Sequence, residues 1–224
     1  MEGFFRFPLN EWPFLFISIA IAFTVHEFAH AYAAFKFGDN TAKDRGRVTL
    51  NPMAHLDVLG TILVFVAGFG WPKPTPVNRN NFKNPRLMGI IVSLVGPLSN
   101  LLIAFIGMFI YLFLVYLNVI ENLSPGATKA IVTMFQYLIS LNITLFIFNL
   151  IPLPPLDGYR IVEDLAPQHI RTRLSQYEHW GVYLFLLIVF ITPLSNVTIG
   201  PLFSLSDDIL LFFSRIISAL FGIG

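Results

Sequence analysis

The sequence has few charged residues and no cysteine. Only 12% of its 224 residues are charged, whereas a soluble domain usually carries about 25%, so an ordinary soluble enzyme is excluded. The lack of cysteine excludes disulfide bonds, thiolate metal ligands and a cysteine nucleophile. The net charge is +1 and no basic run exceeds two residues. A nucleic-acid partner is therefore excluded as well, because such a chain cannot neutralise many phosphates.

The sequence is instead rich in apolar residues. Hydrophobic residues make up 55% of the chain, Phe occurs 24 times and the mean hydropathy is +0.71. A helix needs about 20 apolar residues to cross a bilayer. Four stretches are long enough, namely residues 13–35, 87–120, 130–156 and 180–206. This composition is typical of a protein that crosses a membrane several times.

Two further stretches are shorter. Residues 58–72 are free of charge for only 15 residues, so we expect a re-entrant or β-hairpin segment that protein covers. Residues 209–223 form either a short last span or a helix in the membrane interface. The predicted fold is an all-α multi-pass membrane protein with about four to six transmembrane helices. We expect a single membrane-embedded domain, residues 1–224, with its core at about 13–160 and C-terminal helices at about 180–224.

The basic residues predict how the chain is oriented. Eight of the 14 lie between Lys36 and Arg86, whereas Arg6 and Lys129 are the only ones in the N-terminal tail and in the loop before residue 130. Cytoplasmic loops carry an excess of Lys and Arg. We therefore expect a multi-pass protein of a prokaryotic cell membrane with its N-terminus outside, provided residues 58–72 do not cross. Three more basic residues follow the third run: Arg160, Arg171 and Arg173.

A metal-binding motif lies in the first apolar run. His26-Glu27-Phe-Ala-His30 is an H-E-x-x-H sequence, and on a helix its two histidines project from one face, where they can bind one zinc ion. Glu27 would lie beside the metal without binding it and could move a proton. An ionisable residue inside an apolar span is costly and marks a functional site by default.

A catalytic zinc needs a third protein ligand. Asp157 is the candidate, because three prolines precede it in Asn149-Leu-Ile-Pro-Leu-Pro-Pro-Leu-Asp157-Gly158 and must unwind the helix there. The predicted orientation places this aspartate and the His-Glu-His cluster near the cytoplasmic side.

These motifs together resemble the site-2 protease family. The resemblance includes the H-E-x-x-H in a first span, the distant N-x-x-P-x-P-x-L-D-G and the Gly96-Pro-Leu-Ser-Asn100 between them. The chain looks like the minimal prokaryotic branch, which lacks PDZ and CBS domains. Segments 46–52, 54–57 and 70–78 resemble parts of that branch.

The resemblance implies an intramembrane zinc metalloprotease with one Zn²⁺ per chain. It implies that His26, His30 and Asp157 bind the zinc and that Glu27 is the catalytic base and acid. It also implies that the partners are membrane proteins, cut in a transmembrane segment after another protease has trimmed their outer part. The resemblance further suggests that one or both of Asn100 and Asn149 hold the unwound substrate backbone.

Other polar residues allow more than one interpretation. Asn100 and Asn149 could equally hydrogen-bond a neighbouring helix. Residues 49–52 are β-prone, and their edge could pair with a substrate strand or form a plain hairpin. His55 and Asp57 could assist catalysis or bind a second metal, although a hydrogen-bonded pair is the commoner outcome. His169 and His179 receive no role.

Without the family resemblance, the residues allow two alternative functions besides a protease. In a polytopic transporter, His26, Glu27, His30 and Asp157 would form an ion or proton relay. The sequence has no second copy of its H-E-x-x-H half, which transporters with matched halves would show. The other rival is a noncatalytic scaffold that zinc stabilises, and only an activity assay separates it from a protease.

Overall fold

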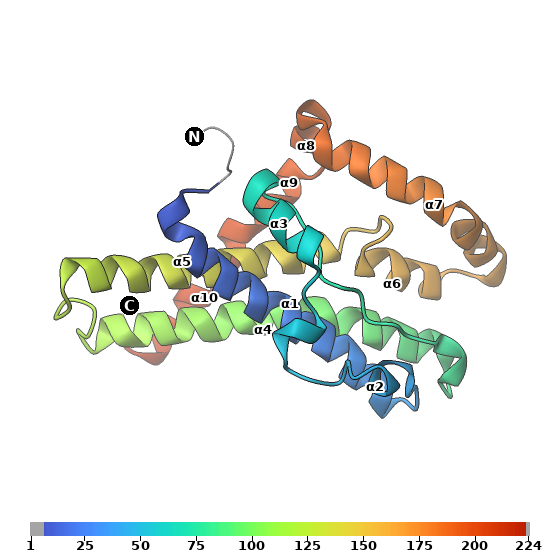
Figure 1. Ribbon diagram of the computed structural model, residues 1–224, viewed down its shortest axis with the longest axis horizontal. Helices are drawn as coiled ribbons and strands as arrows, with labels where there is room; N and C mark the ends of the chain where they lie inside the picture. The colour runs from blue at the N-terminus through green and yellow to red at the C-terminus, as the bar shows by residue number, and fades with distance from the viewer. Residues whose placement is uncertain (1–6, 223–224) are drawn as a thin grey trace.

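A computed structural model describes residues 7–222 (Figure 1). The predicted all-α fold is confirmed, since no β-strand is present in these residues. Three helices are long and apolar enough to cross a membrane, or four if a bent pair near the C-terminus counts as one. Arg6 and Ile223, which entered the sequence predictions, lie outside the described residues.

The three long helices are α1 (Trp12–Lys36), α4 (Pro85–Tyr116) and α5 (Pro125–Asn149). Each has a proline in its first turn, where a missing N–H costs no helical hydrogen bond. The side chains of Asn84 and Ser124 cap α4 and α5 by accepting backbone N–H groups. Local sequence thus explains where these spans begin.

The segment between α1 and α4 is mostly irregular, with short helices at α2 (Thr41–Asp44), η2 (Pro52–Ala54) and η3 (Arg79–Asn81). The predicted strand at residues 49–52 is wrong. Pro52 lacks an N–H for a ladder, and the Asn51 side chain caps η2 by accepting from Met53 N.

The predicted β-hairpin alternative is also wrong for residues 58–72. They form the helix α3 (Val58–Ala67) and a turn, and one isolated bridge joins Leu56 to Pro72. Asp57 caps α3 by accepting from Gly60 N, and Gly68 ends it at a φ of 74°. The two ends of the segment are therefore side by side.

The C-terminal third differs from the prediction of one span at residues 180–206. The chain forms α7 (Gln168–Phe190) and α8 (Thr192–Thr198), which are bent by 100° relative to each other. Pro193 sits in the first turn of α8 and cannot continue α7. Two more helices follow, α9 (Gly200–Phe203) and α10 (Leu205–Leu220).

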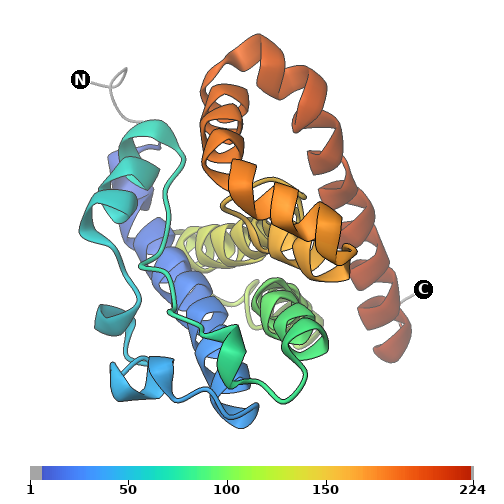
Figure 2. The same ribbon diagram turned by 90° about the vertical axis from the view of Figure 1, so that its right-hand side faces the viewer.

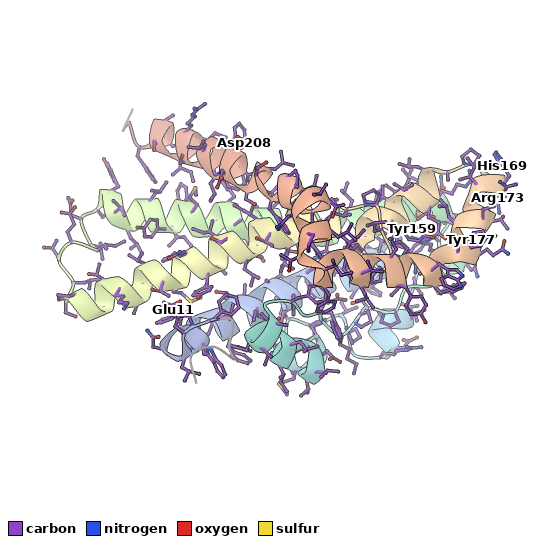
Figure 3. The ribbon with its side chains drawn as sticks, turned by 90° about the horizontal axis from the view of Figure 1, so that it is seen from above. Glu11, Tyr159, His169, Arg173, Tyr177 and Asp208 are labelled. Carbon is purple, nitrogen blue, oxygen red and sulfur yellow. The ribbon has the colours of Figure 1, made fainter. Side chains whose placement is uncertain are left out.

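The antiparallel pair α4 and α5 forms the centre of the molecule. Figure 2 shows α1 and α3 on one side of this pair and α7 and α10 on the other. The largest buried apolar cluster joins α4, α5 and α10, and its members are Ala104, Ile139, Ile143, Ile147, Phe213 and Ile217. In Figure 3, His169 and Arg173 project from the outer end of α7, far from Glu11.

Candidate metal centre

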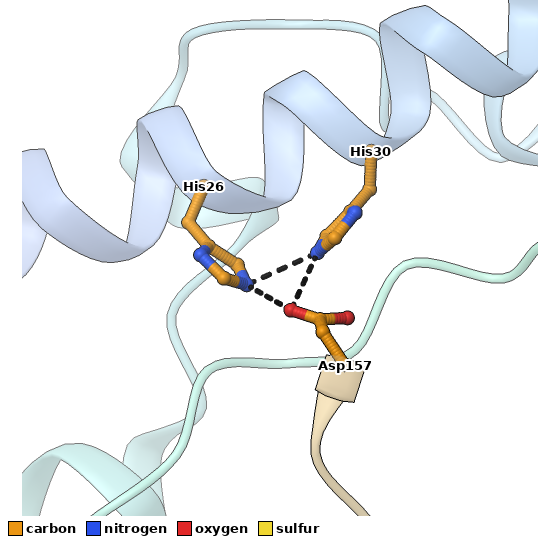
Figure 4. Close-up of side chains that lie close together, drawn as sticks. All are labelled: His26, His30 and Asp157. Atoms are coloured by element: carbon orange, nitrogen blue, oxygen red, sulfur yellow. Dashed lines mark hydrogen bonds and ion pairs between the residues drawn. The ribbon is translucent and has the colours of Figure 1, made fainter. Parts of the chain in front are cut away.

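Two histidines of α1 meet an aspartate at the start of α6 (Asp157–Leu165). The Oδ2 atom of Asp157 lies 3.2 Å from His26 Nε2 and 3.3 Å from His30 Nε2, and the two Nε2 atoms are 3.0 Å apart (Figure 4). His26 and His30 are 6% and 7% exposed. The structure thus brings together three side chains that the sequence singled out.

The other ring nitrogen of each histidine has its own partner. His30 Nδ1 lies 2.6 Å from the backbone oxygen of Val92, and His26 Nδ1 lies 2.7 Å from Asn100 Oδ1. A carbonyl oxygen only accepts, so Nδ1 carries the proton in both rings. In the neutral imidazoles, each Nε2 therefore presents a lone pair to the carboxylate of Asp157.

These three atoms fit one small cation. Zinc binds His nitrogen and carboxylate oxygen at about 2.0–2.2 Å, which sets tetrahedral ligands roughly 3.3–3.5 Å apart. The separations of 3.0–3.3 Å are close to this value. In addition, Asp157 Oδ2 is buried and has no hydrogen-bond donor, which is costly unless a positive charge is present. The donor set therefore fits a zinc ion.

The chain around Asp157 explains how the carboxylate reaches α1. Helix α5 ends at Asn149, and the prolines at 152, 154 and 155 keep the next residues out of the helix. Gly158 lies against the Leu150 carbonyl so closely that a side chain there would collide with it. The chain therefore turns back tightly and places Asp157 at the first position of α6.

A buried charge cluster holds α6 against the rest of the protein. Asp164 is 2% exposed and lies 2.9 Å from Arg79 and 3.2 Å from Arg171. Arg79 also pairs with Glu163 at 3.2 Å. Burial raises the pKa of Asp164, although both arginines oppose this shift. The cluster links α6 to η3 and α7 and so fixes the helix that begins with Asp157.

Helix α4 passes unusually close to the two histidines. A Cβ atom at Gly96 would lie 2.9 Å from His26 Cε1 and closer still to the His30 ring. One turn further along α4, Asn100 is fully buried. Its amide contacts His26, Ala22 and Asn142, so it lies behind His26 and does not line the cavity described below.

Glu27 is buried beside the histidines and contacts the proline-rich segment, residues 71–78. The backbone N–H of Thr75 donates to Glu27 Oε2 at 2.7 Å, and the Thr75 hydroxyl donates to the Glu27 carbonyl at 3.1 Å. Arg47 Nη2 lies 4.0 Å from Glu27 Oε2 and also donates to the Lys73 carbonyl. The segment is not helical, as its prolines predict, and its contact through Thr75 fixes the Glu27 carboxylate.

His55 and Asp57 have separate partners. His55 is fully buried and its Nε2 lies 2.7 Å from the Thr49 carbonyl, whereas Asp57 caps α3. Burial lowers the pKa of His55, and the charge of Arg47 lowers it further. Neither residue belongs to the group of metal-ligand atoms, which in residues 7–222 consists of His26, His30 and Asp157.

A cavity of about 740 Å³ opens at the three candidate ligands. Its walls come from α1, α4, α5, α6, α7 and the proline-rich segment. Apolar lining residues include Phe23, Leu145, Phe148 and Phe185, while Glu27 and Asn149 add polar groups. Such a cavity suits a mostly apolar ligand whose polar groups are positioned at a few points.

Sequence reasoning missed Thr75, Arg47 and Asn142. Thr75 and Arg47 gave no signal, because nothing in a loop sequence tells which backbone N–H will reach Glu27. Asn142 did give one, since it is an amide inside the apolar stretch 130–156 and intramembrane polar residues tend to be functional.

Comparisons with known proteins place the chain in a family. The sequence profile of peptidase family M50 matches residues 14–192. The chain is 50% identical to YwhC of Bacillus subtilis over 221 residues, which are 98% of this chain and all of that protein. It is 29% identical to Rip2 of Mycobacterium tuberculosis over 79% of this chain and 66% of Rip2.

An archaeal protein, MJ0611 of Methanocaldococcus jannaschii, is 30% identical over 66% of this chain and 68% of its own length. All three relatives carry provisional names as zinc metalloproteases. No solved structure matches the chain significantly. The chain belongs to peptidase family M50, the site-2 protease family, and is a zinc metalloprotease of a membrane.

Proposed function

We propose that this protein is an intramembrane protease that hydrolyses peptide bonds within or near transmembrane segments of other membrane proteins. The observation that carries the proposal is the convergence of His26, His30 and Asp157 in a largely apolar cavity between candidate membrane spans. An apolar cavity wall suits the side chains of a membrane-spanning substrate. Family membership favours this function over the transporter alternative.

The metal ligands in this proposal are His26, His30 and Asp157. When bound there, zinc polarises the scissile carbonyl and lowers the pKa of a water molecule. Hydrogen bonds to Val92 and Asn100 orient the two imidazoles before the metal binds, so little reorganisation is needed. Three protein ligands leave one position open, which is the pattern of a catalytic and not a structural site.

Glu27 is the proposed general base and acid. Its carboxylate lines the same cavity as the metal ligands, and the Thr75 N–H holds one of its oxygens. Glu27 accepts a proton from the attacking water and returns it to the leaving amine. Because the proline-rich segment fixes the side chain, the carboxylate remains in position through both transfers.

Asn149 is the proposed contact for the substrate backbone. It lines the cavity at the last turn of α5, and its Nδ2 donates to the Leu145 carbonyl at 2.9 Å, which leaves its oxygen able to accept. A substrate helix must unwind locally before cleavage, because helical hydrogen bonds occupy its carbonyls. Unwinding also frees backbone N–H groups of the substrate, and the Asn149 amide oxygen would accept a hydrogen bond from one of them. A regulated role after a first cleavage outside the membrane follows from the family resemblance.

The proposed orientation puts the N-terminus outside and the metal centre toward the cytoplasm. The buried Asp39 accepts from Asn78 N and from Asn81 Nδ2, both at 2.7 Å. The chain before α3 therefore contacts the chain after it, which supports a segment 58–72 that enters and leaves on one side. In Figure 1, the α4–α5 turn lies at the opposite end from α2.

Cysteine labelling tests this orientation without background, because the protein has no cysteine. We expect Asn40→Cys and Asn80→Cys, both at exposed positions, to react only with a reagent on the cytoplasmic side. Asn122→Cys, exposed in the α4–α5 turn, should react only from outside. If Asn40→Cys and Asn80→Cys are labelled from opposite sides, residues 58–72 cross the membrane and the orientation is wrong.

Gly96→Ala should abolish metal binding even though alanine usually stabilises a helix by up to about 1 kcal/mol relative to glycine. The added methyl group would collide with the His26 and His30 rings and displace them, because both rings pack directly against α4 at Gly96. Gly107→Ala on the same helix is the matched control, because it meets only side chains of Ile139 and Leu138 at 3.3 Å or more. Full zinc content in purified Gly96→Ala would contradict the described geometry.

The proposed function is tested by locating the cut. The purified protein and a library of tagged single-span proteins are reconstituted in liposomes, and mass spectrometry identifies the new termini. We expect termini inside or next to the transmembrane segment. Cleavage confined to soluble tails would show a metalloprotease that does not act within the membrane.

A further inference from the structure

Two buried side-chain amides and one backbone carbonyl form a chain of hydrogen bonds that connects helix α5 to the metal centre. Asn142 Nδ2 donates to the Leu138 carbonyl at 2.7 Å, and Asn142 Oδ1 accepts from Asn100 Nδ2 at 2.8 Å. Asn100 Oδ1 in turn lies 2.7 Å from His26 Nδ1. Both asparagines have no exposed surface.

The Leu138 carbonyl, at the end of the network away from the metal centre, determines which group donates and which accepts in each of these hydrogen bonds. The Leu138 carbonyl only accepts, so the amide NH₂ of Asn142 must face it and the Asn142 oxygen must face Asn100. The NH₂ of Asn100 then faces Asn142 and the Ala22 carbonyl, 3.2 Å away. Only the Asn100 oxygen is left for His26, and it requires a proton on Nδ1.

We propose that Asn142 is a positioning residue of the metal centre, which acts through Asn100 to fix the tautomer and ring orientation of His26. Without Asn142, the Asn100 amide loses one of the two acceptors that hold its orientation. A rotated Asn100 would present NH₂ to His26 Nδ1, which stabilises the tautomer whose Nε2 carries the proton and cannot bind a metal. The inference rests on the proposed role of His26 as a ligand.

A purely structural role is the competing explanation. Amides in apolar helices commonly join neighbouring helices, and Asn142 and Asn100 do join α5 to α4. In that case, replacing Asn142 would lower the thermal stability and leave the affinity for zinc unchanged. The two explanations therefore differ in the metal affinity and not in the stability.

The test measures the zinc Kd by chelator competition on full-length protein in detergent micelles, together with the melting temperature. Loss of a hydrogen bond that orients a metal ligand costs about 10- to 100-fold in affinity. We expect Asn100→Leu to fall in this range and Asn142→Leu to weaken zinc binding about tenfold. In the double variant, Asn142→Leu should add less than about a twofold loss, because its effect passes through Asn100.

Further variants keep the test decisive if Asn142→Leu does not fold. Asn142→Ala removes both hydrogen bonds with a smaller side chain and should weaken zinc binding equally. Ile139→Ala, a buried residue of the same helix, is the cavity control and should lower stability alone. Asn142→Asp, kept neutral by its burial, can still donate to the Leu138 carbonyl and accept from Asn100, so it should retain the wild-type Kd.

Two results would overturn the inference. One is an unchanged zinc Kd in Asn142→Leu and Asn142→Ala, and the other is a full additional loss in the double variant. His26→Ala separates this failure from failure of the ligand set. If His26→Ala retains zinc at the wild-type Kd, the proposed ligands are wrong. If it loses zinc while the Asn142 variants do not, only the role of Asn142 is wrong.

Discussion

Glu27→Gln is expected to cleave a reconstituted single-span substrate about 10²- to 10⁴-fold more slowly than wild type, which is the usual contribution of a general acid and base. Glutamine keeps the shape of glutamate but cannot accept a proton at neutral pH. Its amide oxygen can still accept the Thr75 N–H that Glu27 Oε2 accepts at 2.7 Å. The variant should therefore fold and keep its zinc but lose the proton transfer that Glu27 performs.

The comparison is informative only at matched zinc content and matched melting temperature. Thr75→Val is a useful companion, because it removes the hydroxyl donor to the Glu27 carbonyl and leaves the backbone N–H in place. It should retain most activity. Equal cleavage by wild type and Glu27→Gln would remove Glu27 as general base. A different outcome, in which neither protein cleaves any substrate, would favour the scaffold alternative.

Asp157→Ala should weaken zinc binding by at least a hundredfold. This exceeds the usual effect of losing a hydrogen bond that supports a ligand, which lowers metal affinity about 10- to 100-fold. In the proposed site, this side chain supplies the third donor atom, 3.2 Å and 3.3 Å from the two histidine nitrogens. The measurement is the zinc Kd by chelator competition, with elemental analysis of the purified variant. Zinc-dependent cleavage should fall in parallel.

Asp57→Ala is the matched control for Asp157→Ala. Both aspartates lie at the start of a short helix, but Asp57 only caps α3 by accepting from Gly60 N at 2.8 Å. Its loss should cost about 0.5–2 kcal/mol of stability, the usual value for a helix cap, and leave zinc binding unchanged. Full zinc in Asp157→Ala would exclude this residue as a ligand.

Much of the fold was predictable because local signals coincide with its long elements. The first, second and third apolar runs overlap most of α1, α4 and α5, and proline lies in the first turn of each helix. The bend of 100° between α7 and α8 was not predicted. The uncharged run at residues 180–206 is long enough for one span, but its length does not show that the helix ends just before Pro193.

The three candidate ligands were predictable for a different reason. Two of them follow from helical spacing, and Asp157 follows from the prolines that free its chain from α5. Their surroundings were not predictable, because Thr75 reaches Glu27 from 48 positions away through backbone geometry that leaves no pattern in the sequence. For Asn100, the sequence left open a contact with the substrate and a hydrogen bond to a neighbouring helix. Its burial behind His26 depends on how closely α4 packs against α1, which the sequence does not show.

Zinc titration of cleavage in liposomes tests the central claim, that a single metal at His26, His30 and Asp157 is required for proteolysis of a membrane-spanning substrate. Metal-free protein is prepared with a chelator, and zinc is added back in steps while cleavage within the transmembrane segment is followed. We expect no cleavage without metal and full recovery at one zinc per chain, with no recovery in Asp157→Ala at that ratio. Wild-type rates from metal-free protein would contradict the claim.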